Sequence, residues 1–216
     1  ILLMPGGEKL QLWKNGDNIH FMDEADNSIS LEYIEKNWDV LEPVCLWLKK
    51  LQYLPEEYRN YDVCLEAVKQ YGFSLSSVPK ELRDYNLCLE AVKKDGKSLN
   101  HIKKELLDYN LCLEAVKQYG YALQSVPEEL RDYNLCIEAV KQDGEPLQFV
   151  PEELRDYNLC LTAIKKNGYA LQYVPEELKD YKLCLEAVKQ NGNALQFVPK
   201  EHKNYTICLE SIKQNG

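Results

Sequence analysis

The chain has 216 residues, with 35 acidic and 26 basic side chains and a formal net charge of −9 at pH 7. Proteins that bind nucleic acid usually present a basic surface, because neutralising phosphates supplies much of their affinity, so this charge disfavours nucleic acid and allows a basic protein as partner. No stretch approaches the roughly 18 apolar residues that would span a bilayer, so we expect no membrane partner.

Residues 1–30 are expected to form a hairpin segment. The stretch KLQLWKNGDNIHFMD places the dipeptide Asn15-Gly16 between two runs that alternate apolar and polar residues, which predicts a β-hairpin. One face of that hairpin would hold Leu10, Leu12, Ile19 and Phe21. The opening ILLMPGG is too short for the apolar core of a signal peptide and follows no basic segment.

Residues 31–54 are predicted to be helical, with Ser30 as a cap and an interruption near Pro43. The stretch VCLWLKKLQYLP is similar to a shortened copy of the units that follow it. Because a repeat array needs an atypical end unit to cover its apolar face, we interpret this segment as a degenerate first repeat that caps the array. The alternative is a separate binding element that uses Trp13, Trp38 or Trp47.

Residues 55–216 consist of a 24-residue unit that recurs without insertion or deletion, as in PEELRDYNLCIEAVKQDGEPLQFV from residue 127. Self-similarity at a fixed period of this length is typical of solenoids. There are seven units, and the last one is partial.

Each unit is predicted to hold two helices. The second would run from Tyr85 to Lys94 and its equivalents, because Asp84 is a preferred N-cap and Gly96 suits a left-handed residue after the helix end. The first would begin at Pro79, since proline suits the first helical position, with Leu82 as its buried anchor.

The apolar residues of the second helix cover an arc of roughly 200° at about 100° per residue. A helix on the surface of a compact domain usually buries a narrower stripe, so this one must have neighbours on both sides. The predicted fold is therefore all-α: an α-solenoid of helical-hairpin repeats with a small N-terminal cap of hairpin and helix.

One Cys recurs in every unit and lies in the middle of this buried arc. Disulfides need Cα atoms closer than about 7 Å, whereas equivalent residues of neighbouring helices lie about 8–10 Å apart. No pair has the spacing typical of zinc ligands, so we expect packing rather than a metal site, a redox role or a cofactor. The residues are Cys64, Cys88, Cys112, Cys136, Cys160, Cys184 and Cys208.

The pattern VPEELRDYxLCLEAVKxNGxAL resembles the tandem helical-repeat family called domain of unknown function 4116, over residues 55–216. The resemblance implies helical tandem repeats and a bacterial or viral source. It assigns no catalytic residue. The family is often described in units of about two of these repeats.

The residues on either side of the repeated Gly alternate between aromatic and polar, which gives a second period of two units. The aromatic members are Tyr71, Phe73, Tyr119, Tyr121 and Tyr169. A second variable position turns aromatic at Phe149, Tyr173 and Phe197. These eight side chains are the candidate binding residues. For the residues beside the Gly, packing or duplication of a two-repeat unit is the favoured explanation, whereas for the second position burial in the core and binding are equally good explanations. The Tyr that begins every second helix is expected to have a structural role.

No motif for phosphate binding, metalloprotease or nucleophilic catalysis is present, and a uniform array places like groups in rows, so we expect no enzyme. The leading hypothesis is a scaffold that presents an extended surface to another protein. The alternatives are an inhibitor or immunity-type protein that blocks a toxin, nuclease or host enzyme, and a passive spacer. Eight cysteines without an export signal favour a reducing, cytoplasmic compartment, with delivery into a host cell left open.

Overall fold

The computed structural model describes residues 2–3, 9–15, 18–22, 51, 56 and 59–215. The chain divides into two compact units, residues 1–83 and 84–216, which are described separately below. The helix expected over residues 31–54, together with Trp38 and Trp47, lies outside the described residues except for Leu51.

The first unit holds an antiparallel sheet with the strand order β1-β2-β3. Its strands are β1 Leu2–Leu3, β2 Lys9–Asn15 and β3 Asn18–Met22. Leu12 pairs with Phe21, and Asn15 pairs with Asn18. The hairpin predicted from the sequence is confirmed, with its connection beginning after Asn15, and β1 adds a strand that the sequence did not predict.

The first unit also holds one complete repeat. It consists of the α-helix α3 Tyr61–Gln70 and the 3-10 helices η3 Gly72–Ser77 and η4 Lys80–Leu82. The side chain of Asn60 accepts a bond from the amide of Val63, 3.0 Å away, and so caps α3.

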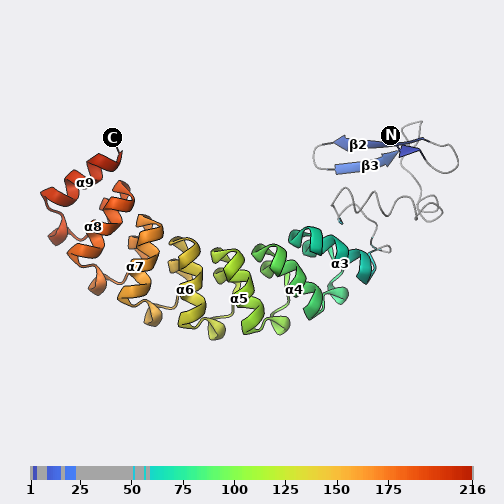
Figure 1. Ribbon diagram of the computed structural model, residues 1–216, viewed down its shortest axis with the longest axis horizontal. Coiled ribbons are helices and arrows are strands. Elements are labelled where there is room, and N and C mark those ends of the chain that lie inside the picture. Colours follow the sequence, from blue (N-terminus) through green and yellow to red (C-terminus); the bar gives the residue numbers. More distant parts are fainter. Residues whose placement is uncertain are drawn as a thin grey trace. The chain divides into compact units, whose positions relative to one another are not determined.

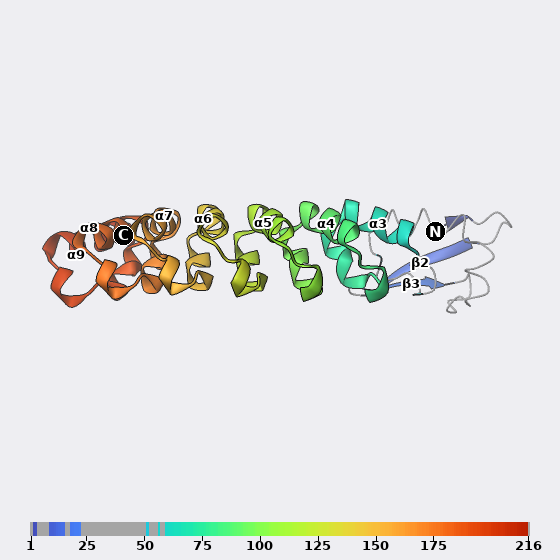
Figure 2. The ribbon, with the colours of Figure 1, turned by 90° about the horizontal axis from the view of Figure 1, so that it is seen from below.

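The second unit is a stack of such repeats (Figure 1). Neighbouring α-helices contact one another along the stack, and so do the longer 3-10 helices, so the two kinds of helix form separate rows (Figure 2). The α-helices are α4 Tyr85–Lys94, α5 Tyr109–Gln118, α6 Tyr133–Gln142, α7 Tyr157–Lys166, α8 Tyr181–Gln190 and α9 Tyr205–Asn215. The longer 3-10 helices are η5 Gly96–His101, η7 Gly120–Ser125, η9 Glu145–Phe149, η11 Gly168–Tyr173 and η13 Gly192–Phe197. The shorter ones are η6 Lys104–Leu106, η8 Glu128–Leu130, η10 Glu152–Leu154, η12 Glu176–Leu178 and η14 Lys200–His202.

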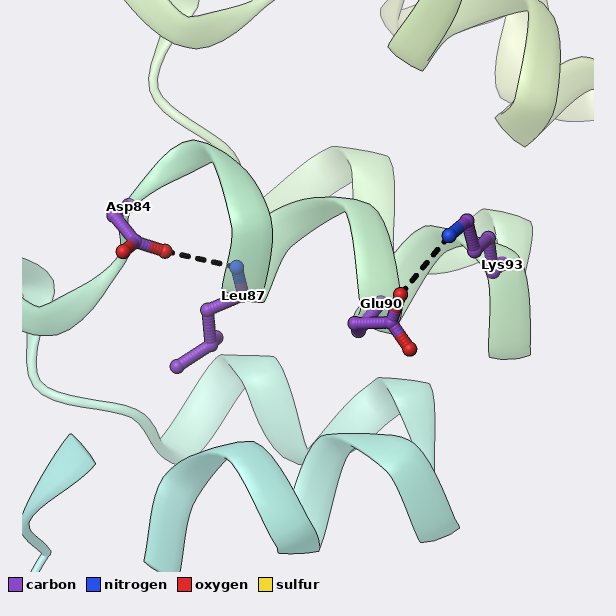
Figure 3. A network of polar contacts seen from close by, with 4 residues as sticks. All are labelled: Asp84, Leu87, Glu90 and Lys93. Atoms are coloured by element: carbon purple, nitrogen blue, oxygen red, sulfur yellow. Dashed lines mark hydrogen bonds and ion pairs between the residues drawn. The ribbon is translucent and has the colours of Figure 1, made fainter. Parts of the chain in front are cut away.

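The α-helix of each repeat begins and ends where the sequence predicted. The Asp84 carboxylate accepts a bond from the amide of Leu87, 2.8 Å away, which satisfies one of the orphan donors of the first turn (Figure 3). Lys93 forms an exposed ion pair with Glu90 at 3.0 Å, also drawn in Figure 3, which contributes little to stability. None of the described helices is long and apolar enough to cross a membrane.

The first helix of each predicted hairpin differs from the expectation. The segment after each α-helix forms two 3-10 helices, and Pro127 precedes the second one, η8, instead of opening an α-helix. Proline at this point breaks the helical run, because it supplies no amide and forces the residue before it, Val126, into the extended region. Leu82 is only half-buried, so it is not the anchor that the sequence predicted.

The repeated Gly is required for a reason other than the left-handed conformation that the sequence predicted. Gly144 has φ −72° and ψ −27°, angles that any residue adopts. A Cβ atom built on Gly144 would lie 2.1 Å from the carbonyl oxygen of Ala163 in the next helix. The same clash would occur at 2.3 Å between Gly96 and Ala115. Glycine is therefore selected by close approach of two backbones in successive repeats.

Each repeat contributes four α-helical side chains to the core, in addition to a buried Leu or equivalent residue of its longer 3-10 helix, such as Leu99 or Leu123. In α4, Leu87, Cys88, Ala91 and Val92 are 0 % exposed. Stacking causes this burial, as two equivalent positions show: Val188 in α8 is 0 % exposed, whereas Ile212 in α9, the last helix described, is 68 % exposed. The Cys side chains from 64 to 184 are buried free thiols, which agrees with the packing interpretation.

An arginine at the end of the shorter 3-10 helix joins successive repeats, and we call this arrangement the arginine clamp. Arg131 donates from Nε to the carbonyl of Val126, in the preceding repeat, at 2.9 Å and from Nη1 to that of Phe149, in its own repeat, at 2.8 Å. It also donates from Nη2 to the carbonyl of Gln124 at 3.3 Å. Arg155 forms the same three bonds one repeat later, to Val150, Tyr173 and Gln148.

The Tyr at the start of each α-helix joins repeats in a similar way. The hydroxyl of Tyr109 donates to the Asp132 carboxylate, 3.3 Å away, and Asp132 is the N-cap of the following helix. Tyr133 makes the same bond with Asp156. Each N-cap thus serves its own helix and the repeat before it, which supports the structural role expected for this Tyr.

Replacing Gly144 with Ala tests the close approach. Where space is open, Gly→Ala stabilises a protein by about 0.4–1 kcal/mol through the unfolded state. Here the backbone contact forces a shift of the helix, so we expect a loss of about 1–3 kcal/mol in the free energy of unfolding, measured by urea denaturation. The exposed Lys165→Ala change is the control and should stay within about 0.5 kcal/mol. A stabilised Gly144→Ala variant would contradict the packing argument.

Alkaline pH should weaken the fold. Burial raises the pKa of the Cys112, Cys136 and Cys160 thiols from 9.0 to about 11. Because the unfolded chain ionises these thiols first, unfolding releases protons, and stability should fall as pH rises from 9.0 to about 11. The urea midpoint measures this decline. A variant with all three changed to Ala should lose less stability over the same window, and an equal slope in both proteins would refute the assignment.

Candidate functional site

The candidate aromatic residues flank the Gly that follows each α-helix, and we call these flanking positions the loop edge. Tyr119 is the last residue before η7, and Tyr121 lies in its first turn. Tyr169 occupies the same place as Tyr121 two repeats later, in η11. Their side chains lie at the ends of the α-helices, where the backbone turns back toward the second row.

The aromatic residues of the loop edge at Gly120 contact each other and side chains of the two adjacent repeats. The rings of Tyr119 and Tyr121 stack with their centroids 5.5 Å apart. Tyr121 packs edge-on against Phe149 of the following repeat at 6.4 Å. From the preceding repeat, the Lys97 ammonium lies 5.0 Å from the centre of the Tyr119 ring. Contacts of this kind are favourable beyond the area that they bury. The cluster therefore spans three repeats.

Glu145 extends this cluster to a fourth repeat. Its carboxylate accepts a bond from the Tyr121 hydroxyl on one side and from the Asn167 side-chain amide, 3.2 Å away, on the other. Burial, together with the bond to Glu145, raises the pKa of the Tyr121 hydroxyl well above its usual value. Tyr121 therefore stays protonated and acts as a hydrogen-bond donor to Glu145 at every physiological pH.

A second aromatic pair follows along the same edge. Tyr169 packs edge-on against Phe197 with the ring centroids 5.9 Å apart. The two sets of aromatic positions found in the sequence are thus brought together, because in both pairs a loop-edge ring contacts the variable ring of the following repeat. Tyr173 is half-buried, and its backbone carbonyl accepts a bond from Arg155.

The exposure of the candidate residues differs between the two units. In the first unit, Tyr71 is 42 % exposed and Phe73 is 57 % exposed. In the second unit, all the candidate rings are half-buried. Half-buried rings that support one another still present a face to solvent, and they lose little conformational freedom when a partner covers that face. The arrangement suits recognition of another surface.

The site shows no arrangement for redox or metal chemistry. Within residues 59–215, no three His, Cys, Asp or Glu side chains gather as a metal site would require. The thiol of Cys136 lies in the core, where burial raises its pKa to about 11 and so suppresses the nucleophilic thiolate.

Comparison with known proteins identifies the family to which this chain belongs. The model of the family described as Domain of unknown function (DUF4116) matches residues 29–83, 84–131, 132–179 and 180–216. The chain belongs to this family. The match begins at residue 29, earlier than the residue 55 at which the resemblance in the sequence began. No curated protein and no solved structure matches the chain.

The DUF4116 matches at 84–131 and 132–179 each span two of the 24-residue repeats, as the resemblance implied. The matches at 84–131 and 132–179 begin at the N-cap residues Asp84 and Asp132. In both, the first loop edge is polar or charged, with Lys97 and Glu145, and the second contains an aromatic, Tyr121 or Tyr169. The alternation found in the sequence therefore has the period of the family unit.

Sequence reasoning missed the arginine clamp and its exception in the repeat 103–126. The clamp position holds Arg or Lys in every complete repeat of residues 55–198 except one, where Leu107 stands. The same repeat has Lys103 in place of the Pro. Aligning the repeats column by column would have found this exception. The aromatic alternation is the more conspicuous pattern in the sequence, because aromatic residues are common interface anchors.

Glu145 should couple two repeats energetically. Glu145→Ala removes the acceptor for Tyr121 and Asn167, and we expect it to cost about 1 kcal/mol in the free energy of unfolding. A double-mutant cycle with Tyr121→Phe should give a coupling energy of about 0.5–1.5 kcal/mol, measured by urea denaturation. The exposed Glu153→Ala serves as control and should show no coupling. Additive effects of Tyr121→Phe and Glu145→Ala would rule out the contact.

Proposed function

We propose that this DUF4116 chain is a non-enzymatic scaffold that binds another protein through the loop edge of its repeats. The observation that carries the proposal is the aromatic and polar cluster that runs from Lys97 through Tyr121 to Asn167 across four repeats. A ligand that contacts every part of such a strip must itself be extended, which favours a macromolecule over a metabolite.

The composition of the strip supports a protein as the partner. Tyr and Phe are enriched at the centres of protein interfaces, because they bury a large area with few rotatable bonds. The net charge of −9 favours a partner with a basic surface, since complementary charge accelerates association. The same charge gives no support to nucleic acid.

The uniformity of the array supports a binding role without catalysis. An active site needs unlike groups that converge at one point. The polar contacts that recur in the described repeats, such as Tyr109 with Asp132 and Tyr133 with Asp156, join identical groups in rows. They stabilise the stack and leave the loop edge as the part that varies.

An inhibitor is the second candidate, and the acidic charge favours it. A toxin or nuclease that acts on nucleic acid has a basic active-site cleft, which an acidic protein would attract and cover. The scaffold and the inhibitor share the loop edge as the binding surface. They differ in whether the partner loses an enzymatic activity when it is bound.

Replacing the loop-edge aromatics tests the binding surface. The variant Tyr71→Ser, Phe73→Ser, Tyr119→Ser, Tyr121→Ser and Tyr169→Ser should lose affinity for the partner by about a hundredfold or more, because anchor residues commonly contribute at least about 2 kcal/mol each. The partner is first recovered from lysates at low and physiological salt. Its affinity for both proteins is then measured with purified components by calorimetry.

A matched control removes aromatic surface elsewhere. Tyr181, 37 % exposed, and Tyr205, 80 % exposed, begin α8 and α9 and lie away from the loop edge. Changing both to Ser should leave the affinity unchanged. Equal affinity of the loop-edge variant and the wild-type protein, with both folded by circular dichroism, would refute the loop-edge proposal. Failure to recover any partner at either salt would favour the spacer.

A further inference from the structure

The second unit contains a hollow at the repeat 103–126, the one complete repeat whose clamp position holds neither Arg nor Lys. The hollow has a volume of about 450 Å³, and its lining includes Leu99, Asn100, Ile102, Leu107 and Ser125. Leu107 stands at the position that Arg131 and Arg155 occupy in the following repeats. The hollow therefore lies where a guanidinium is bound in those repeats.

The lining matches the acceptors of the clamp residue by residue. Arg131 binds the carbonyls of the residues five and seven positions before it and 18 positions after it, which are Val126, Gln124 and Phe149. Counted from Leu107, the same offsets give Ile102, Asn100 and Ser125, all of which line the hollow. Leucine has no donor, so these three carbonyls lack the guanidinium that their counterparts bind.

The backbone at Ile102, which presents one of these carbonyls, keeps a similar conformation. Ile102 has φ −95° and ψ 139°, close to the φ −72° and ψ 130° of Val126. Its carbonyl therefore points in about the direction that suits a guanidinium in the next repeat. In addition, the Ser125 hydroxyl donates to the side-chain oxygen of Asn100, so two residues that line the hollow are joined to each other.

We propose that this hollow binds an arginine side chain of the protein partner, in the position that the chain's own arginine occupies in other repeats. The proposal rests on the proposed binding function and adds a specific residue type to it. Guanidinium presents five donors in a planar fork and suits several carbonyls at once, whereas an ammonium does not match this geometry. Leu99 and Leu107 would pack against the methylene groups of the arginine.

The charges around the hollow are compatible with this guest. Lys104 also lines it, which would oppose a cation. However, Lys80 stands at the equivalent position in the repeat of Arg83, whose guanidinium donates to the carbonyl of Val78 at 2.8 Å. A lysine at that position thus coexists with a bound guanidinium. The net charge of −9 attracts a basic partner to the whole chain.

Methyl NMR on leucine-labelled full-length protein tests the hollow directly. The probe is N-acetyl-arginine N-methylamide, and its citrulline analogue, which has the same shape without the charge, is the control ligand. We expect saturable shifts of the Leu99 and Leu107 signals with the arginine probe and none with citrulline. Leu123 and Leu147 are equivalent to Leu99 at the places where Arg131 and Arg155 fill the corresponding space, so the signals of these two leucines should not shift.

Two variants of the chain should change the NMR response to the probe in opposite directions. Leu107→Arg fills the hollow from within, so the Leu99 signal should no longer respond to the probe. Arg131→Leu opens a new hollow one repeat later, so the Leu123 signal should begin to respond. No saturable shift in the wild-type protein, or equal shifts with arginine and citrulline, would overturn the proposal. If Leu107→Arg does not fold, the response of the Leu123 signal in Arg131→Leu still tests the proposal.

The affinity of the partner for the variants then distinguishes a failure of this inference from a failure of the proposed function. Leu107→Arg should weaken the partner's affinity by about tenfold or more, because a hydrogen-bonded charge is lost from the interface. If Leu107→Arg binds the partner with unchanged affinity, the inference is overturned, even if the capped arginine binds to the hollow. The proposed function would still stand in that case, provided that the loop-edge variant loses the partner. If the loop-edge variant keeps its affinity, the proposed function itself fails.

Discussion

The stack of residues 84–215 depends on the contact between a glycine and the backbone of the next helix. Gly96, Gly120, Gly144 and Gly168 each approach a carbonyl of the following repeat more closely than any Cβ atom would allow. That carbonyl belongs to an Ala, whose small side chain leaves room for the approach. The same carbonyl also accepts a hydrogen bond from the amide of the residue that follows its own helix; for Ala115, the donor is the amide of Tyr119, 2.9 Å away. One atom thus sets both where a helix stops and how closely the preceding repeat packs. An inserted residue between the Ala and the Gly would misplace both, which explains why the repeats keep a constant length.

The remaining bonds between repeats follow from this spacing. The arginine clamp binds a carbonyl five residues before it, in the preceding repeat, and the Tyr hydroxyl reaches the N-cap 23 residues ahead, in the following repeat. Stability therefore accumulates as a sum of nearest-neighbour terms, as in other solenoids. In such an array a substitution disturbs two interfaces at most, so a single repeat can depart from the pattern without loss of the fold. The Leu107 repeat, which has lost both the clamp and the Pro, is such a departure.

The sequence predicted the parts of the repeat that depend on local interactions. The limits of α4 follow from the Asp84 cap and from the positions of Leu87 and Val92, all within one helix. The role of Gly144 and the arginine clamp were not predicted, because each depends on a residue of the neighbouring repeat. The same holds for the loop edge. The alternation between successive units identified Tyr121 and Phe149 as candidates, but no local pattern shows that rings in two different repeats touch.

The loop edge and the hollow share one structural element, which gives the two binding proposals a common geometry. The 3-10 helix η7, Gly120–Ser125, carries Tyr121 near its start and Ser125 at its end. At a rise of about 2 Å per residue, the helix is only about 10 Å long. A partner segment that covers the Tyr121 ring is therefore within reach of the hollow, and an arginine side chain extended from that segment spans the remaining distance. A flat aromatic strip supplies area but little discrimination, because every apolar surface fits it to some degree. A hollow lined by Asn100, Ile102 and Ser125 beside the strip would supply the discrimination, since a partner without the arginine would leave the carbonyls of these residues covered and unpaired.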